Sequence, residues 1–455
     1  MRNKQPLFST VLVFFTRGHE RSIKAKQNIL ISFLIRGFSI AISIVLVPIT
    51  INYVNPTKYG IWLTLSSIVA WFGFFDIGFG NGMRNRFAEA IANGEQQKAR
   101  IYVSTTYAIL SIIVLIVLLL FFAINPLLDW SKILNTPPEM ADELKLLALI
   151  VFVFFCLQFV LQLLTTVITA NQQPAKASLF NLIGSIISLT VIFVLTKTTS
   201  GSLLYLGAVF SSAPVLVLAV SSFWLYRSTY REYAPSTKFV QFRYARNLMS
   251  LGLKFFVLQV AAVILYETSN IIIAQLFGPS QVTPYNIAYK YFSLVPMVLG
   301  IIMIPFWSAF TEAWVKQDLA WIKHTMRNLI YMWAGFTVLA VIMLVFSDFV
   351  YGIWVGKAVE VSWSISIVMT AYVVINGWCG IFSQFLNGVG KIKLQLYSSL
   401  FGALVNIPLA IFLGKQLGVA GVVLSTCLIG LISAVWSPIQ YTKLINSRAT
   451  GIWNQ

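Results

Sequence analysis

The chain has 455 residues, of which 58% are hydrophobic and 10% are charged, and its mean hydropathy is +0.82. Soluble globular domains carry about 25% charged residues, so this composition excludes a water-soluble enzyme or binding module and indicates a polytopic membrane protein. The net charge of +18 could suggest a nucleic-acid-binding protein, but the placement of the charges along the chain argues against one.

Apolar segments of about 20 residues recur along the whole chain, and each is long enough to cross a bilayer as a helix. We predict twelve spans, near 28–52, 59–81, 101–124, 146–169, 177–196, 203–226, 250–275, 284–309, 328–348, 362–387, 394–414 and 418–441. The expected fold is therefore an all-α integral membrane protein. Its predicted parts are a segment 1–27, an N-terminal lobe 28–226, a basic linker 227–249, a C-terminal lobe 250–443 and a tail 444–455.

The basic residues follow the expected membrane topology. If the N-terminus is cytoplasmic, 23 of the 32 Lys and Arg residues fall in cytoplasmic segments and six fall on the opposite side. This asymmetry is the positive-inside signal, and it accounts for nearly all of the net charge without a polyanionic partner. We therefore expect both termini on the cytoplasmic side of the membrane.

The second span and the residues after it form the most distinctive stretch of the sequence. The stretch is predicted to begin as an apolar helix at Tyr59 and to carry the acid Asp76 deep within that helix. A cluster of three glycines at 78–82 then interrupts it. The segment from Arg84 to Arg100 is predicted to be a basic amphipathic helix on the cytoplasmic side.

The second half of the sequence echoes the first. The motif Phe-Ala-Glu-Ala at 87–90 follows the second span, and Phe-Thr-Glu-Ala at 310–313 follows the eighth. The turn after the fourth span, 168–179, has a counterpart at 385–396 after the tenth. These matches predict two pseudo-symmetric six-helix lobes with the same orientation, related by an axis along the membrane normal.

Five charged residues lie inside predicted spans: Arg36, Asp76, Lys254, Glu267 and Lys290. All five fall on spans 1, 2, 7 and 8, which are equivalent pairs under the repeat. Charged side chains at membrane depth face the bundle interior or a water-filled cavity. The pattern therefore predicts a central cleft lined by these four helices.

Each charge also has a structural explanation. Lys254 lies about one turn inside its span, so it could extend its ammonium group to the lipid headgroups. Arg36 and Asp76 could form a structural ion pair as readily as a substrate site. Glu267 could bind a coupling H⁺ or Na⁺, or it could be a neutral, hydrogen-bonded carboxyl group without a transport role.

We find no sequence motif for catalysis or for a resident cofactor. The three cysteines lie inside predicted spans and form no CxxC pair, so packing explains them better than a disulfide or metal site. Motifs for a phosphate-binding loop, an HExxH zinc site and a nucleophile elbow are also missing from the sequence. We therefore expect no cofactor, no metal site and no enzymatic activity.

Three motifs carry a resemblance to a known family: YGIW at 59–62, FFDIGFGNGMRNRFAEA at 74–90 and PFWSAFTEAW at 305–314. With these motifs and twelve spans, the sequence resembles the lipid-linked oligosaccharide flippases of bacterial polysaccharide and O-antigen biosynthesis. Their superfamily also contains the multidrug and toxic-compound exporters. The resemblance implies two six-helix lobes around a V-shaped cleft.

The resemblance also implies a function and a location. Such a flippase would move undecaprenyl-diphosphate-linked oligosaccharide across the bacterial inner membrane by alternating access, beside a polysaccharide polymerase and other assembly proteins. Cations in the cleft would hold the diphosphate, a role that suits Arg36 and Lys290, with Arg84 and Arg86 at the cytoplasmic mouth. Asp76, Glu267 and Lys254 are further candidates for residues of the cleft or of ion coupling.

Two other functions remain open from the sequence. Asp76 and Glu267 are compatible with a multidrug or cation antiporter of the same fold, although three cations outnumber two acids in the spans. A membrane-embedded polysaccharide polymerase or ligase fits less well. Such an enzyme would be expected to carry a large outer loop, and it leaves the internal repeat unexplained.

Overall fold

The computed structural model describes residues 20–76, 78–171, 173–246, 248–249 and 267–455. All regular structure within these ranges is helical, and nine of the helices there are long and apolar enough to cross a membrane. Segment 1–19 and most of the predicted seventh span, including Lys254, lie outside the described residues. The prediction of an all-α integral membrane fold is confirmed.

The helices of the N-terminal half include counterparts of the first six predicted spans, of which the second is broken. They are α2 (Glu20–Val54), α3 (Pro56–Ala70), α4 (Phe79–Ala92), α5 (Gln96–Ile124), α6 (Trp130–Leu134), α7 (Ala141–Leu161), α8 (Leu163–Ala170), α9 (Pro174–Thr198) and α10 (Leu203–Arg227). The first span begins eight residues earlier than expected, and α7 and α8 together form the fourth.

The C-terminal half continues in the same way. Its helices are α12 (Thr268–Phe277), α13 (Val282–Phe292), α14 (Leu294–Val315), α15 (Leu319–Val345), α16 (Ser347–Trp354), α17 (Trp363–Val389), α18 (Lys393–Leu417) and α19 (Val419–Ile445). The predicted eighth span is α13 and α14, which meet at Ser293. A short 3₁₀ turn, η7 (Pro279–Gln281), joins α12 to α13.

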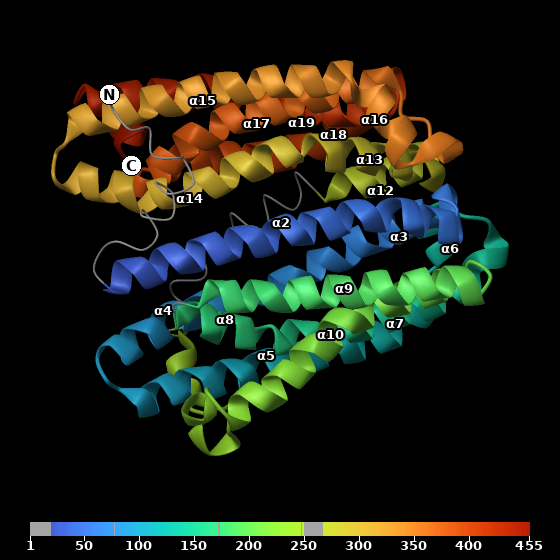
Figure 1. Cartoon of the computed structure of the whole chain (residues 1–455), viewed down its shortest axis with the longest axis horizontal. Coiled ribbons are helices and arrows are strands. Elements are labelled where there is room, and N and C mark those ends of the chain that lie inside the picture. Colours follow the sequence, from blue (N-terminus) through green and yellow to red (C-terminus); the bar gives the residue numbers. More distant parts are fainter. Residues whose placement is uncertain (1–19, 77, 172, 247, 250–266) are drawn as a thin grey trace, which may run out of the picture.

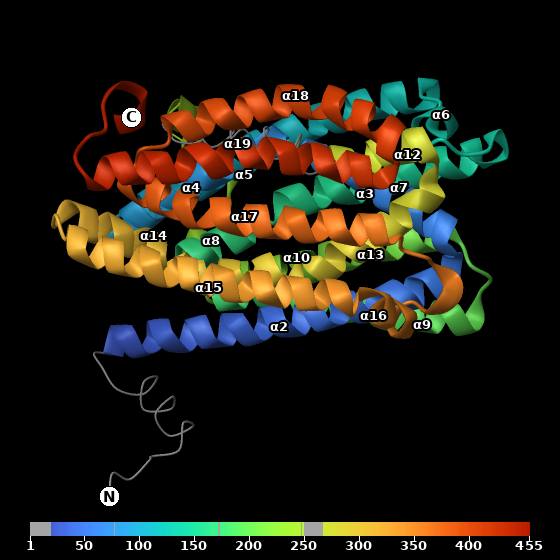
Figure 2. The same ribbon diagram turned by 90° about the horizontal axis from the view of Figure 1, so that it is seen from above.

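The two halves form two helical bundles that lie side by side along their length (Figure 1). Seen from above, the C-terminal bundle lies in front of much of the N-terminal one, while α2 stays in view beside it (Figure 2). Both bundles have two ends. We call one the basic end, because it carries α4, the turn at 93–95 and the linker at 228–246. The other, with α6, η7 and α16, is the loop end.

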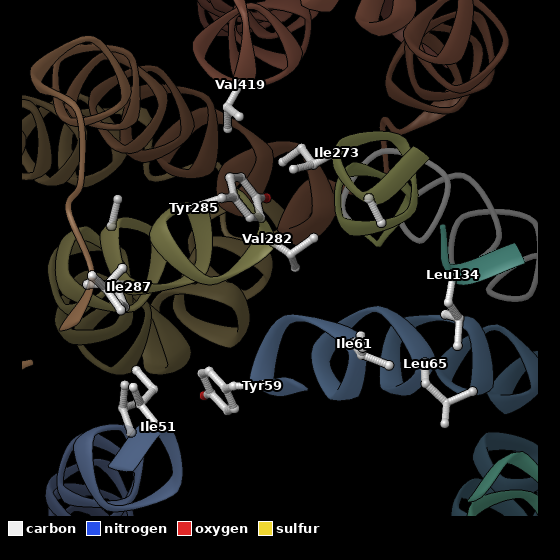
Figure 3. Packing of buried hydrophobic residues seen from close by; sticks show 14 of the residues in the cluster. Ile51, Tyr59, Ile61, Leu65, Leu134, Ile273, Val282, Tyr285, Ile287 and Val419 are labelled. Atoms are coloured by element: carbon white, nitrogen blue, oxygen red, sulfur yellow. The ribbon is translucent and has the colours of Figure 1, made fainter. Parts of the chain in front are cut away.

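The hydrophobic core shows where the bundles meet. One cluster contains buried residues of both halves, including Tyr59 and Leu65 of α3, Ile273 of α12 and Tyr285 of α13 (Figure 3). Two further clusters each belong to one half, at 79–248 and at 299–445, and these contain the residues nearer the basic end. The bundles therefore share a core towards the loop end and have separate cores towards the basic end.

The shared core brings backbone against backbone at Gly60. Asn55 caps α3 by accepting a hydrogen bond from the Lys58 amide at 2.9 Å, and Pro56 occupies the first helical turn. This start presents Gly60 to η7, where an added Cβ atom would lie 1.8 Å from the Pro279 carbonyl oxygen. Only glycine permits this approach of the two bundles.

The second span differs from its prediction, because it is broken before the glycine cluster is reached. The α-helical part ends at Ala70, and residues Trp71–Asp76 form the 3₁₀ turn η1. Gly78 then adopts a left-handed conformation with φ of 79° and begins α4. Asp76 therefore ends a 3₁₀ turn rather than lying deep within an α-helix, and the left-handed glycine explains the change of direction.

The predicted basic helix from Arg84 to Arg100 is also interrupted. It consists of the second half of α4 and the start of α5, joined by a turn at 93–95 in which Gly94 has φ of 74°. A residue with positive φ cannot continue a right-handed helix. The segment is therefore a helical hairpin rather than one amphipathic helix.

Candidate functional site

Lys290 lies where α13 faces α2, at a boundary between the two bundles that we call the α2–α13 seam. Its ammonium group donates to the Ser43 hydroxyl of α2 at 3.4 Å. Among the described residues, Lys290 has no carboxylate within ion-pair distance. The ammonium group carries three N–H donors, so it keeps hydrogen-bonding capacity for an anion in addition to Ser43.

Arg36 lies on the same side of α2 as Ser43. Seven residues separate them, which corresponds to two helical turns and a rise of about 10 Å. The Arg36 side chain is exposed, and it lies closer to the basic end than Ser43 does. Helical periodicity therefore puts Arg36 in line with Ser43, the partner of Lys290, and about two turns nearer the basic end.

Glu267 lies elsewhere, in a buried polar network at the contact of α12, α13 and α3. It immediately precedes α12, and its carboxylate is within hydrogen-bonding reach of the Ser67 hydroxyl in α3. Asn270 donates to the same hydroxyl at 2.7 Å, and Asn286 of α13 donates to the Asn270 side-chain oxygen at 2.7 Å. This network joins the two bundles through side chains that are mostly buried.

Two of the predicted site residues cannot be placed in this geometry. Lys254 lies outside the described residues. The backbone of Asp76 ends η1, but its side chain lies outside the part of the chain that the structure describes. The expected pairing of Arg36 with Asp76 therefore stays a prediction.

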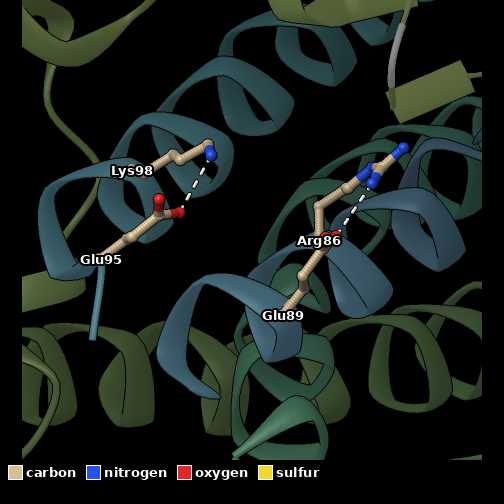
Figure 4. Close-up of polar contacts among 4 residues, drawn as sticks. All are labelled: Arg86, Glu89, Glu95 and Lys98. Carbon is tan, nitrogen blue, oxygen red and sulfur yellow. Dashed lines mark hydrogen bonds and ion pairs between the residues drawn. The ribbon is translucent and has the colours of Figure 1, made fainter. Parts of the chain in front are cut away.

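Arg84 and Arg86 lie in α4 at the basic end, as their position after the glycine cluster predicts. Arg84 is exposed, whereas Arg86 is partly covered and forms an ion pair with Glu89 at 2.8 Å (Figure 4). Lys98 and Glu95 form a similar pair at 2.9 Å at the start of α5. Neither arginine is brought to the α2–α13 seam.

The candidate charged residues that the structure describes thus lie in three separate places. Arg36 and Lys290 lie along the seam, Glu267 lies in the buried network, and Arg84 and Arg86 lie at the basic end. A search for charges alone overlooks the neutral members of both groups. These are Ser43, Ser67 and Asn286, which hold the charged groups in position. The available signal was the presence of Asn and Ser within otherwise apolar spans, since such groups seek partners in a membrane.

Comparisons with known proteins identify a family for the chain. A family model described as polysaccharide biosynthesis protein matches residues 25–308, and a second, described as MatE, matches residues 256–412. One relative is a Salmonella typhi protein whose name describes it as a proposed O-antigen transporter. It is 21% identical over 440 residues, which cover 92% of this chain and 97% of the relative. A Yersinia pseudotuberculosis protein, named as a proposed O-antigen export protein, is 23% identical and covers 88% and 92%.

Solved structures of multidrug transporters share the fold. An inward-facing multidrug resistance MATE family transporter superposes with a TM-score of 0.73 at 13% identity, covering 93% of this chain and all of that one. An outward-facing structure of a MATE family transporter gives a TM-score of 0.61 at 15% identity, with 96% and 98% covered. This likeness confirms two pseudo-symmetric helical lobes of the MATE type.

The relatives and the structural neighbours are transport proteins of the membrane. The structural neighbours share the fold built here from multiple apolar helices in two bundles. Since the first family model extends over well more than half of the 455 residues, the chain belongs to the polysaccharide biosynthesis protein family.

Proposed function

We propose that this protein is a flippase without enzymatic activity. It moves polyprenyl-diphosphate-linked oligosaccharide, an O-antigen or other surface polysaccharide unit, across the bacterial inner membrane by alternating access. The basic end and both termini face the cytoplasm, in keeping with the positive-inside rule. The translocated lipid is then available to a polysaccharide polymerase on the other side. The names of the relatives and the family match support this substrate class.

The observation that carries the proposal is the pair of cations along the α2–α13 seam. Arg36 presents a planar guanidinium group suited to two phosphate oxygens, and Lys290 presents a compact ammonium group. Lys290 has only the 3.4 Å contact to Ser43 as a described hydrogen bond. A diphosphate that enters from the basic end would meet Arg36 first and Lys290 about two turns deeper.

The contacts between the bundles support a state that is open to the cytoplasm. Towards the loop end the bundles share a core, and hydrogen bonds cross between them, as from Thr283 to the Pro56 carbonyl oxygen at 2.7 Å and from Trp354 to the Ile44 carbonyl oxygen at 2.8 Å. Towards the basic end each bundle has its own core. Rocking of the bundles would therefore break the loop-end contacts and bring the basic ends together.

Glu267 provides a means to couple this motion to an ion gradient. Its carboxylate shares the Ser67 hydroxyl with Asn270, and Ser67 belongs to the other bundle. Binding of H⁺ or Na⁺ to the carboxylate would weaken the hydrogen bond that it accepts from the Ser67 hydroxyl. The ion would therefore act on a contact between the bundles. We propose Glu267 as the coupling residue on this ground.

The test is complementation of a strain that lacks its own flippase, with surface polysaccharide as the readout. Arg36→Ala and Lys290→Ala should each abolish most of the polymer at normal protein levels, and Lys290→Arg should restore part of it. Lys415→Ala, an exposed lysine at the loop end, is the matched control and should behave as wild type. Normal polymer from both alanine variants would remove the seam from the mechanism.

A multidrug or cation antiporter is the second candidate. The observation that favours it is Glu267 within the segment matched by the MatE model, residues 256–412. It predicts that Glu267→Gln raises drug sensitivity while surface polysaccharide stays normal. The flippase predicts the reverse, because the same variant should reduce polymer and leave drug sensitivity unchanged.

A further inference from the structure

A cavity of about 550 Å³ lies on the α2–α13 seam, between Lys290 and the loop end. Its walls come from both bundles: α2 contributes one side, and α13, the start of α14, and α16 contribute the other. The lining residues of α2 are Ile44, Val45, Pro48 and Ile49. The volume lies within the range of about 300–1,000 Å³ that is usual for small-molecule sites. The cavity is therefore large enough to hold part of a lipid chain.

The polar groups on the cavity wall leave a single position for an anion. Of the lining side chains, only those of Lys290, Tyr291 and Trp354 have polar atoms. The Tyr291 hydroxyl donates to the Met343 carbonyl oxygen at 3.0 Å, and the Trp354 indole donates to the Ile44 carbonyl oxygen at 2.8 Å. The ammonium group of Lys290 is the lining donor that retains capacity, since its contact with Ser43 is long.

The remaining wall is apolar and opens towards the lipid. Val45 and Ile353 line the cavity, and their side chains are 47% and 72% exposed in the isolated protein. In a membrane such apolar surface faces acyl chains rather than water. A hydrocarbon chain can therefore pass from the bilayer into the cavity without crossing a polar surface, and it would end beside the cation.

We propose that this cavity holds the isoprenoid units next to the diphosphate of a polyprenyl-diphosphate substrate, with Lys290 on the adjoining phosphate. This inference rests on the proposed function and adds to it a separate site for the lipid. Charge complementarity and the apolar wall of this cavity select the ligand, which is one chain with one anionic group. The substrate would then be recognised by its lipid as well as by its charge, whatever glycan it carries.

The experiment measures binding of undecaprenyl phosphate to the purified full chain in lipid nanodiscs. Val45→Trp and Ile353→Trp both fill the mouth of the cavity, and because both positions are exposed they leave the core intact. Each should weaken binding by about tenfold, since an indole would occupy the volume that the chain needs. Leu404→Trp, at a 78% exposed position of α18, is the matched control and should leave binding unchanged.

A second comparison separates the chain from the anion. Lys290→Ala should weaken binding of undecaprenyl phosphate and leave binding of the uncharged undecaprenol unchanged, whereas Val45→Trp should weaken both. Wild-type binding of undecaprenyl phosphate by both tryptophan variants would overturn the proposal. If phosphatidylglycerol competes for the same site and binds as tightly as undecaprenyl phosphate, the assignment to a prenyl lipid is wrong.

Surface polysaccharide from four variants separates a failure of the lipid-chain site from a failure of the proposed transport mechanism. If both tryptophan variants produce normal surface polysaccharide while Arg36→Ala and Lys290→Ala do not, the proposed function stands and the chain site is wrong. If all four variants produce normal polymer, the seam has no part in transport, whereas failure of the wild-type chain itself to restore polymer would refute the proposed function.

Discussion

Gly60→Ala should shift the protein from its present state towards one that is closed at the basic end. The added Cβ atom would lie 1.8 Å from the Pro279 carbonyl oxygen, while Cβ atoms essentially never approach within 3.0 Å of another heavy atom. The clash is with backbone, so a side-chain rotation cannot relieve it. The N-terminal part of α3 and η7, which belong to opposite bundles, must therefore separate by more than about 1 Å.

The size of the effect follows from the cost of overpacking. Forcing a methyl group into a filled contact costs about 1–3 kcal/mol. The clash arises only where α3 meets η7, so it penalises the state that is closed at the loop end and not the alternative. A penalty of about 1–3 kcal/mol changes the ratio of the two states by about 5- to 150-fold.

The assay is a distance measurement between spin labels at the basic end. Labels at Ala88 in α4 and Val315 in α14, both exposed, report on the separation of the bundles in a background without the native cysteines. Gly60→Ala should add a population at shorter distance. Gly300→Ala is the matched control, because an added Cβ there has no heavy atom within 4 Å. An unchanged distance distribution in Gly60→Ala would refute the view that this contact holds the loop end closed.

Three further substitutions test other contacts. Asn270→Ala removes the Asn270 amide that donates to the buried Ser67 hydroxyl, and it should lower the free energy of unfolding by about 1–3 kcal/mol, measured by denaturation in detergent. Trp354→Phe removes the hydrogen bond to the Ile44 carbonyl oxygen, and in the spin-label assay it should shift the population in the same direction as Gly60→Ala, by less than about tenfold. Lys98→Ala breaks an exposed ion pair and should leave the melting temperature unchanged; a clear decrease would show that surface pairs at the basic end matter more than solvent screening allows.

Most of the fold could be predicted because hydrocarbon imposes a simple rule. A segment that crosses it must satisfy its backbone hydrogen bonds internally, so an apolar run of about 20 residues predicts a helix with few alternatives. This holds for α9 and α10, whose bounds at Pro174–Thr198 and Leu203–Arg227 lie within a few residues of their predictions. The same rule could not locate the break in the second span, since Trp71–Asp76 is as apolar as a helix and forms a 3₁₀ turn instead.

The candidate site could be predicted only in part, and for a physical reason. A charge in an apolar span is conspicuous, so Arg36, Glu267 and Lys290 were identified directly from the sequence. Which of them lie together depends on the packing of helices that are far apart in the chain. The contact of Lys290 with Ser43 spans 247 residues, and that of Asn270 with Ser67 spans 203. The prediction that all five charges share one gap stays a prediction, because Lys254 and the Asp76 side chain lie outside the part that the structure describes. Glu267 lies apart from Lys290, in a network with Ser67 and Asn270.

That separation bears on the mechanism. If Glu267 lay beside Lys290, the two would form a pair, and an anionic substrate would have to displace the carboxylate before it could bind. With Glu267 held instead by the Ser67 hydroxyl, to which Asn270 also donates, the seam keeps its positive charge for the substrate while the acid acts on a contact between the bundles. Substrate and ion would then influence each other only through the state of the bundles. Such coupling is reciprocal, so Glu267→Gln should change the affinity for undecaprenyl phosphate although the residue does not line the cavity.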